Sequence, residues 1–157
     1  KSPAAVPKLL KLASSDPSAD VVSMAIWALG EIGDVRAAAH LAHLLPEAAL
    51  QATALEALRR LGAAVLPELE RAFAAAEPAA RCLLLDLVGK LEDPRARKLL
   101  LQALSDQSPV VRAAAALALG EGGFLDAVRP LMLVKEKDPS PEARQAAAAA
   151  LRKLAPR

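Results

Sequence analysis

Apolar residues recur every four positions in five stretches of this sequence, and each stretch ends at an apolar residue that we use as a landmark. The landmarks are separated by 29, 30, 31 and 32 residues. A spacing of four places side chains along one face of a helix, so each stretch predicts a helix with one buried stripe. The expected stripes are Val21, Ala25 and Leu29; Leu50, Ala54 and Leu58; Ala80, Leu84 and Val88; Val111, Ala115 and Leu119; and Ala143, Ala147 and Leu151.

A second apolar stretch follows each of the first four landmarks and predicts a second helix. Each second helix has an apolar anchor, at Leu41, Leu69, Leu100 or Leu131. Glycine tolerates the left-handed conformation that ends a helix, so we expect the glycines after each landmark to separate the two helices. These glycines are Gly30, Gly33, Gly62, Gly89, Gly120, Gly122 and Gly123.

The helix pairs are separated by typical helix-start signals, such as Asp16-Pro17, Glu77-Pro78 and Asp138-Pro139. No segment alternates with a period of two, so we predict no strands. The chain then forms a single repeat domain over residues 1–157, with partial repeats at both ends. The predicted boundaries are 1–15, 16–45, 46–75, 76–105, 106–137 and 138–157.

Three short motifs resemble the HEAT repeat family, and in particular its short bacterial form, often labelled the bilin-lyase type. They are Pro109 to Ala115 leading to Leu119-Gly120, Leu29 to Asp34, and Asp93 to Ala96 followed by Leu99-Leu100. The resemblance covers nearly the whole chain and implies an all-α, right-handed α-α superhelix, or solenoid, of helical hairpins. The second repeat departs most, with Gln51 where later repeats carry arginine and Arg59 where the first has Gly30.

A solenoid presents a curved surface that its second helices line, and in the HEAT family this is the concave surface. Positions two before and two after each anchor point away from the core. They form a mixed stripe with a slight basic excess, which predicts a groove for an acidic or polar segment of another protein. The alternative is a plain solvated helix face. The columns are Lys11, His43, Arg71, Gln102 and Leu133 on one side, and Pro7, Ala39, Pro67, Lys98 and Arg129 on the other.

Trp27 lies two positions before its landmark, on the outward side of a first helix. Tryptophan is enriched at binding hot spots, so Trp27 is a candidate anchor for a partner. The favoured alternative is that a preceding repeat covers it. The open ends of the array predict either further repeats in a longer chain or self-association through the terminal repeats.

Other polar residues are expected to be structural. Arg81, Arg112 and Arg144 recur at one repeat position and Asp34 and Asp93 at another. The resemblance to HEAT-like proteins implies that such charges tie adjacent repeats together. Cys82 has no adjacent histidine and is expected to be inert.

No catalytic or metal-binding motif is present. His40 and His43 have a spacing that suits two metal ligands, but no third ligand is recognisable. Neither histidine precedes a glutamate, whereas a metal-dependent hydroxylase built on HEAT-like repeats uses paired His-Glu motifs. The glycine-rich segment from Gly120 to Gly123 lacks the Gly-Lys-Ser/Thr of a phosphate-binding loop. We therefore expect no catalytic residues, no metal site and no cofactor.

Composition narrows the functional classes further. Hydrophobic residues make up 54% of the 157 residues and aromatic residues 2%, so the core is built from Leu, Val and Ala. The net charge of +2 and the single Trp argue against nucleic acid as a partner. No apolar stretch is long enough to span a bilayer. The lone cysteine fits a reducing compartment, which makes the cytoplasm the expected location, and the Ala- and Arg-rich composition suits a bacterial source.

These observations favour a non-catalytic scaffold that binds another protein. Two alternatives remain open. The repeat subtype alone implies a bilin-lyase-like enzyme or chromophore chaperone, although such a site needs more aromatic residues than this chain has. A HEAT-like DNA glycosylase would need a basic channel with aromatic residues and a catalytic acid.

Overall fold

The computed structural model describes residues 2–91 and 93–155. Within these residues ten α-helices and four short 3-10 helices follow one another without a strand, which confirms the all-α prediction. The α-helices are α1 (Val6–Ser15), α2 (Ala19–Ile32), α3 (Ala38–His43), α4 (Ala48–Leu61), α5 (Leu66–Ala75), α6 (Pro78–Gly89), α7 (Ala96–Ala103), α8 (Pro109–Glu121), α9 (Val128–Lys137) and α10 (Pro141–Leu154). The 3-10 helices are η1 (Pro3–Ala5), η2 (Val35–Ala37), η3 (Gly62–Val65) and η4 (Leu125–Ala127).

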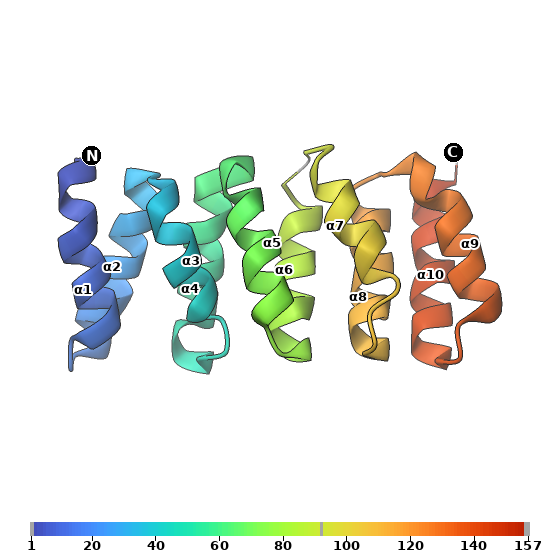
Figure 1. Ribbon diagram of the computed structural model, residues 1–157, viewed down its shortest axis with the longest axis horizontal. Coiled ribbons are helices and arrows are strands. Elements are labelled where there is room, and N and C mark those ends of the chain that lie inside the picture. Colours follow the sequence, from blue (N-terminus) through green and yellow to red (C-terminus); the bar gives the residue numbers. More distant parts are fainter. Residues whose placement is uncertain (1, 92, 156–157) are drawn as a thin grey trace. The chain divides into compact units, whose positions relative to one another are not determined.

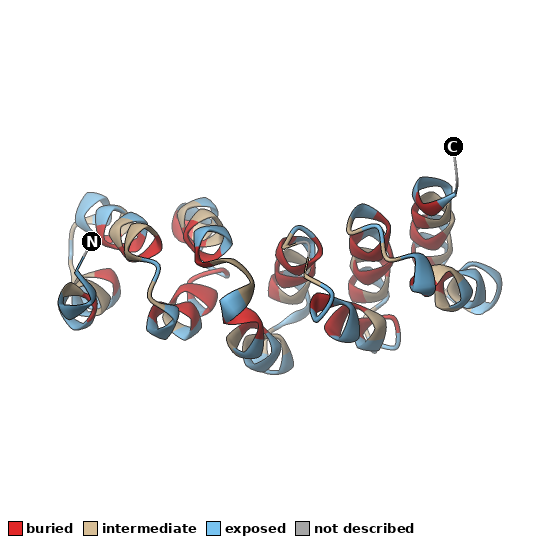
Figure 2. Ribbon diagram, turned by 90° about the horizontal axis from the view of Figure 1, so that it is seen from above, coloured by how far each residue is buried: buried red, intermediate tan, exposed pale blue. Residues whose placement is uncertain are grey.

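The helices group into two compact units, and the single repeat domain over residues 1–157 stays a prediction. Unit 1 ends at Ala75 and unit 2 begins at Ala76. In unit 1 the first helices α2 and α4 form one layer and the second helices α1, α3 and α5 form the other (Figures 1 and 2). Unit 2 has the same arrangement, with α6, α8 and α10 in one layer and α7 and α9 in the other.

The core of each unit lies between its two layers, where the buried residues gather in Figure 2. All four predicted anchors, Leu41, Leu69, Leu100 and Leu131, have no exposed surface. Burial of a leucine side chain contributes about 2 kcal/mol, so these positions dominate the stability of each hairpin. The landmarks are buried equally well, except at the last repeat. There Leu151 is only partly buried, because α10 packs through Ala143, Ala146, Ala147, Ala150 and Leu154.

One residue of the predicted stripes is misplaced. Val21 is 38% exposed, and its neighbour Val22 is buried in its place. A shift of one position turns the side chain by about 100° around the helix, so the buried face of α2 differs at its first turn from the face of the other first helices.

Three of the glycines expected between helices are instead helical residues, within α2 and α8 and at the last position of α6. Gly30, Gly89 and Gly120 are helical and buried, each against an alanine of the next first helix. A Cβ at Gly120 would lie 2.7 Å from the Cα of Ala150, and a Cβ at Gly30 would lie 2.8 Å from the Cα of Ala57. These glycines are needed for close helix approach. The left-handed conformation is found at Gly33, which caps α2 with a φ of 78°, and also at Gly62 and Gly123.

Arginine–aspartate pairs join successive repeats of unit 2, as the sequence predicted for Arg81 and Arg112. An Nη of Arg81 lies 2.9 Å from the Asp106 carboxylate. Arg112 donates to both oxygens of Asp138, from Nε at 2.7 Å and from Nη2 at 2.9 Å. The same aspartates accept the backbone N–H two residues later, so they also order the turn that starts the next helix. Arg144 instead donates to the backbone oxygens of Asp138 and Pro139.

Asp34 and Asp93 have the structural role that was predicted, but they bond within their own loops and do not tie adjacent repeats together. Each carboxylate accepts from the side chain and the backbone N–H of the arginine two residues later, Arg36 or Arg95. The pKa of Asp34 falls to about 2 because Arg36 hydrogen-bonds its charged form. Each carboxylate lies only two residues from an arginine in the same tight loop. This arginine neutralises its charge, so no partner from another repeat is needed.

Candidate functional site

All six residues predicted for partner binding are exposed on second helices. Three belong to unit 1, namely Lys11 of α1, His43 of α3 and Arg71 of α5. The other three belong to unit 2, namely Lys98 and Gln102 of α7 and Arg129 of α9. Except for Lys11, which follows the partly buried Leu9, each follows or precedes a fully buried anchor by two positions. The helical periodicity that buries the anchor therefore turns these side chains to solvent.

The cations among these residues differ in whether their charge is already neutralised. An Nη of Arg71 lies 2.6 Å from the Glu68 carboxylate on the same helix. Within the residues that the structure describes, Lys98 and Arg129 form no ion pair, since the cations paired in unit 2 are Arg81, Lys90, Arg95, Arg97, Arg112 and Lys153. In unit 1, Lys11 also forms no ion pair with a described residue. Unit 2 therefore carries two unpaired cations of this set and unit 1 carries one.

A cavity of about 420 Å³ lies between α7 and α9, the two helices that carry the unpaired cations of unit 2, and its lining begins one residue after Arg129, at Pro130. Leu101 and Leu104 line it from α7, and Leu133 and Val134 line it from α9. Leu133 is 56% exposed, so the apolar surface of this cavity is open to solvent. Apolar concave surface with a few polar groups at its edge is the usual composition of a binding site.

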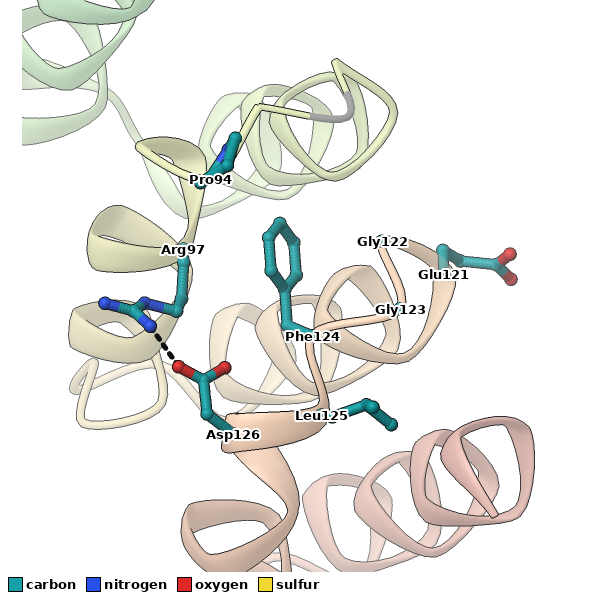
Figure 3. A pocket seen from close by; sticks show the side chains of 8 residues that line it. All are labelled: Pro94, Arg97, Glu121, Gly122, Gly123, Phe124, Leu125 and Asp126. Carbon is teal, nitrogen blue, oxygen red and sulfur yellow. Dashed lines mark hydrogen bonds and ion pairs between the residues drawn. The ribbon is translucent and has the colours of Figure 1, made fainter. Parts of the chain in front are cut away.

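A larger cavity, of about 680 Å³, opens at the turn between α8 and η4 (Figure 3). The ring of Phe124 projects from this turn toward the segment that carries Pro94, while Glu121 points away. Arg97 of α7 pairs with Asp126 of η4 across the cavity edge. Because each charge here is compensated by its neighbour, the turn offers less attraction for a charged partner than the groove between α7 and α9.

Trp27 is half exposed on α2 and borders a cavity of about 330 Å³ in unit 1. The other lining residues, Ala52, Thr53, Glu56, Ala57 and Arg60, all belong to α4. The structure thus places the indole on the side of the following first helix, and not on the side where a preceding repeat would pack. Met24, one turn earlier on α2, is 66% exposed and extends this apolar surface.

The two histidines lie near each other on α3 but are not part of a metal-binding cluster. Across residues 2–91 and 93–155, no three His, Cys, Asp or Glu side chains come together in a way that would hold a metal ion. His43 is exposed, whereas His40 is half buried beside Ser14, whose Oγ lies 3.4 Å from Nε2. Both histidines line a cavity of about 300 Å³ in unit 1, together with Asp16 and Glu47.

The burial of His40 predicts a pH effect on the stability of unit 1. Burial and the neighbouring His43 lower the pKa of His40, although the backbone of Ala13 and the charge of Glu47 partly oppose this. The unfolded chain therefore takes up this proton more readily than the folded chain, and stability is expected to fall as the pH drops through about 6.5. Urea unfolding at several pH values between neutral and mildly acidic measures the effect.

His40→Gln should flatten this pH dependence, because glutamine does not titrate. His43→Gln is the matched control and should retain most of it, since His43 is exposed. Equal pH dependence in the parent protein and the His40→Gln variant would contradict the assignment.

Cys82 lies half buried on α6, and its Sγ lies 3.6 Å from the backbone oxygen of Val110. Burial raises the pKa of the Cys82 thiol, as do the carboxylates of Asp106 and Glu142. A thiol with a raised pKa is a poor nucleophile, which supports the structural role expected from the sequence. No helix in the described part of the chain is both long and apolar enough to cross a membrane.

Stacked helical hairpins, with an anchor leucine and an arginine–aspartate tie repeated from one hairpin to the next, place the protein among the α-helical repeat proteins. The model of HEAT repeats matches residues 1–59 and 63–152. The chain belongs to the HEAT repeat family.

Solved structures support the same fold. Human deoxyhypusine hydroxylase, in complex with glycerol, is 18% identical, with a TM-score of 0.59 over 98% of this chain and 74% of that one. An engineered protein is also 18% identical, with a TM-score of 0.51 over 95% of this chain and 78% of that one. At this level of identity the likeness concerns the fold alone. No curated protein matches the sequence.

The apolar residues that separate the charged positions on α7 and α9 were not among the residues predicted to bind a partner. Leu101, Leu104 and Val134 look like core residues in the sequence, yet they line the open cavity. The available signal was Leu133, an apolar residue in a column of otherwise polar outward positions. An apolar residue at a position that the helical period turns to solvent indicates an interaction surface.

Proposed function

We propose that this protein is a scaffold that binds another protein through the exposed faces of its second helices, and that the bound segment is acidic or polar. The observation that carries the proposal is the uncompensated positive charge of Lys98 and Arg129 on the two helices that line an open apolar cavity. Repeat proteins build extended surfaces of this kind from equivalent positions in successive repeats.

The remaining observations are consistent with the proposal. The core side chains are apolar throughout, and no polar or charged residue is buried in the described part of the chain. The polar residues that are partly buried, such as Asp106, Arg112 and Asp138, bond one another or the backbone. Their roles are accounted for by the repeat architecture, which leaves the outward side chains of the second helices for recognition.

Charge reversal tests the proposal. The variant Arg71→Glu, Lys98→Glu, Arg129→Glu is expected to capture its partner from native lysate at least about ten-fold less efficiently than the parent protein, because acidic segments are then repelled. All three side chains are exposed, so the variant should fold normally. Quantitative mass spectrometry of affinity-captured proteins measures the loss.

A matched control reverses three exposed cations of first helices, Arg59, Arg152 and Lys153. This control changes the net charge by the same amount but leaves the second helices intact, so it should retain the partner. Capture that survives reversal on the second helices, or is lost equally in both variants, would show that these faces do not form the binding surface.

A further inference from the structure

The cavity between α7 and α9 combines an apolar centre with positive charge at both ends. Six apolar residues line its centre, namely Leu101, Leu104, Pro130, Leu133, Val134 and Pro139. We call this the α7–α9 groove.

The cations stand at defined places along the groove. Lys137 lines it directly at the end of α9. Arg129 lies one helical turn before Leu133, and Lys98 lies one turn before Leu101, so both stand near the opposite end. Lys137, like Lys98 and Arg129, forms no ion pair with any residue that the structure describes.

The nearby carboxylates do not cancel this charge. Asp138 lines the groove, but only 6% of its side chain is exposed and its oxygens are occupied by Arg112 and the backbone N–H of Ser140. Glu136 is exposed one turn beyond Leu133 and two turns beyond Arg129, so it lies beside the rim and offsets one positive charge there. Among the described residues, the three unpaired cations still outnumber this one free carboxylate. The groove therefore keeps a net positive rim.

The spacing of the cations and the apolar centre along α9 indicates what kind of peptide the groove would bind. Arg129 and Lys137 are separated by eight residues of one helix, or about 12 Å, and Leu133 lies midway. In an extended peptide, side chains two apart point the same way and residues four apart lie about 13 Å from each other. Two carboxylates at the first and fifth positions, with an apolar side chain at the third, thus match the two cations and the apolar centre.

We propose that the α7–α9 groove binds an extended acidic segment in which one apolar side chain stands between two carboxylates four residues apart. This rests on the proposed function, because it names the chemistry of the partner that one part of the second-helix surface accepts. A protein segment fits better than a single-stranded nucleic acid, because none of the residues that line the groove is aromatic and could stack on a base.

A synthetic peptide with glutamate at its second and sixth positions, leucine at the fourth and serine or glycine elsewhere provides the probe. Titrated into the full ¹⁵N-labelled chain, it is expected to shift amide resonances of α7 and α9 saturably, with a Kd below about 1 mM. Peptides with serine in place of leucine, or glutamine in place of both glutamates, should each bind at least about ten-fold more weakly. Raising the salt concentration from about 50 to about 300 mM should weaken the parent peptide further.

Protein variants complete the test. Leu133→Ser and the pair Arg129→Glu, Lys137→Glu should each weaken the peptide about ten-fold, and all three positions are exposed, so the fold should be retained. Arg152→Glu, at an exposed cation of α10, is the control and should bind normally.

Three results would overturn the proposal: no saturable shift, shifts that map outside α7 and α9, or an oligonucleotide that binds the groove with no dependence on Leu133. If the peptide fails while lysate capture still depends on Lys98 and Arg129, the scaffold function stands and only the chemistry assigned to the segment is wrong.

Discussion

Asp138→Ala is expected to lower the free energy of unfolding of unit 2 by about 3 kcal/mol, because it leaves an almost buried arginine without its partner. The Asp138 and Arg112 side chains are 6% and 13% exposed, and two hydrogen bonds of 2.7 and 2.9 Å join them. The same carboxylate accepts the backbone N–H of Ser140 at 2.8 Å, at the start of α10. One substitution thus removes both the tie between two repeats and the order of the turn between them.

Urea unfolding of the full chain measures this loss, and two further variants separate its causes. Asp138→Asn keeps an oxygen for the Ser140 N–H and should lose less, because only the charge is removed. Asp86→Ala removes a carboxylate whose pair with Lys90 is exposed, and should change the free energy by less than about 0.5 kcal/mol. Equal effects of Asp138→Ala and Asp86→Ala would contradict the structural role of the tie.

The same pair also contributes to the acid sensitivity of unit 2. The Arg112 guanidinium lowers the pKa of Asp138, so the folded protein holds this carboxylate charged at a pH where the unfolded chain begins to take up the proton. The stabilisation is therefore complete at neutral pH and is lost as the pH falls below about 4.

Gly120→Ala is expected to destabilise unit 2 by about 2 kcal/mol, although the same change in an open helix would stabilise it by about 1 kcal/mol. The added Cβ would lie 2.7 Å from the Cα and 2.9 Å from the Cβ of Ala150. The Cα is a backbone atom of α10, and the Cβ is fixed directly to it. No rotamer change can therefore relieve the overlap. The two first helices must move apart, which loosens the packing along both.

A double-mutant cycle with Ala150→Gly isolates this contact. The double variant should be less destabilised than the sum of the single variants by about 1 kcal/mol, because one of the two overlapping methyl groups is gone. Rescue should be partial, since the Cα of residue 150 remains in the way. A Gly120→Ala variant that is more stable than the parent protein would show that α8 and α10 do not approach so closely.

The glycine contacts show what the sequence of a repeat does not reveal about its packing. The recurrence of glycine after each landmark was visible, but it was interpreted as a break between helices. Gly30, Gly89 and Gly120 instead continue their helices, because the nearest atoms that exclude a side chain come from the next repeat, about 30 residues away. Local rules for glycine describe only its own backbone, so they cannot reveal a contact of this kind.

In the candidate site, too, the sequence predicted which side chains face the solvent better than it predicted the groove between the helices. The helical period alone placed Lys98, Gln102 and Arg129 on the solvent side of α7 and α9. Each lies two positions from Leu100 or Leu131, and both leucines are buried. The sequence signals the apolar groove between those helices only at Leu133, because Leu101 and Val134 look like core residues. Whether such a residue is covered depends on the distance between two helices that are not neighbours in the chain.

By itself, the sequence determined the all-α class, the hairpin order, the anchor leucines and the arginines that tie the repeats of unit 2, but not the aspartates that they bond. Each of these follows from spacing within a repeat or from residues that recur at the repeat length. Tertiary structure alone decided that Asp34 and Asp93 bond within their own loops, that Val22 replaces Val21 in the core, and that α7 and α9 leave an open apolar groove. The physical reason is that periodicity specifies which way a side chain points, whereas its burial and its partner depend on what another helix places there.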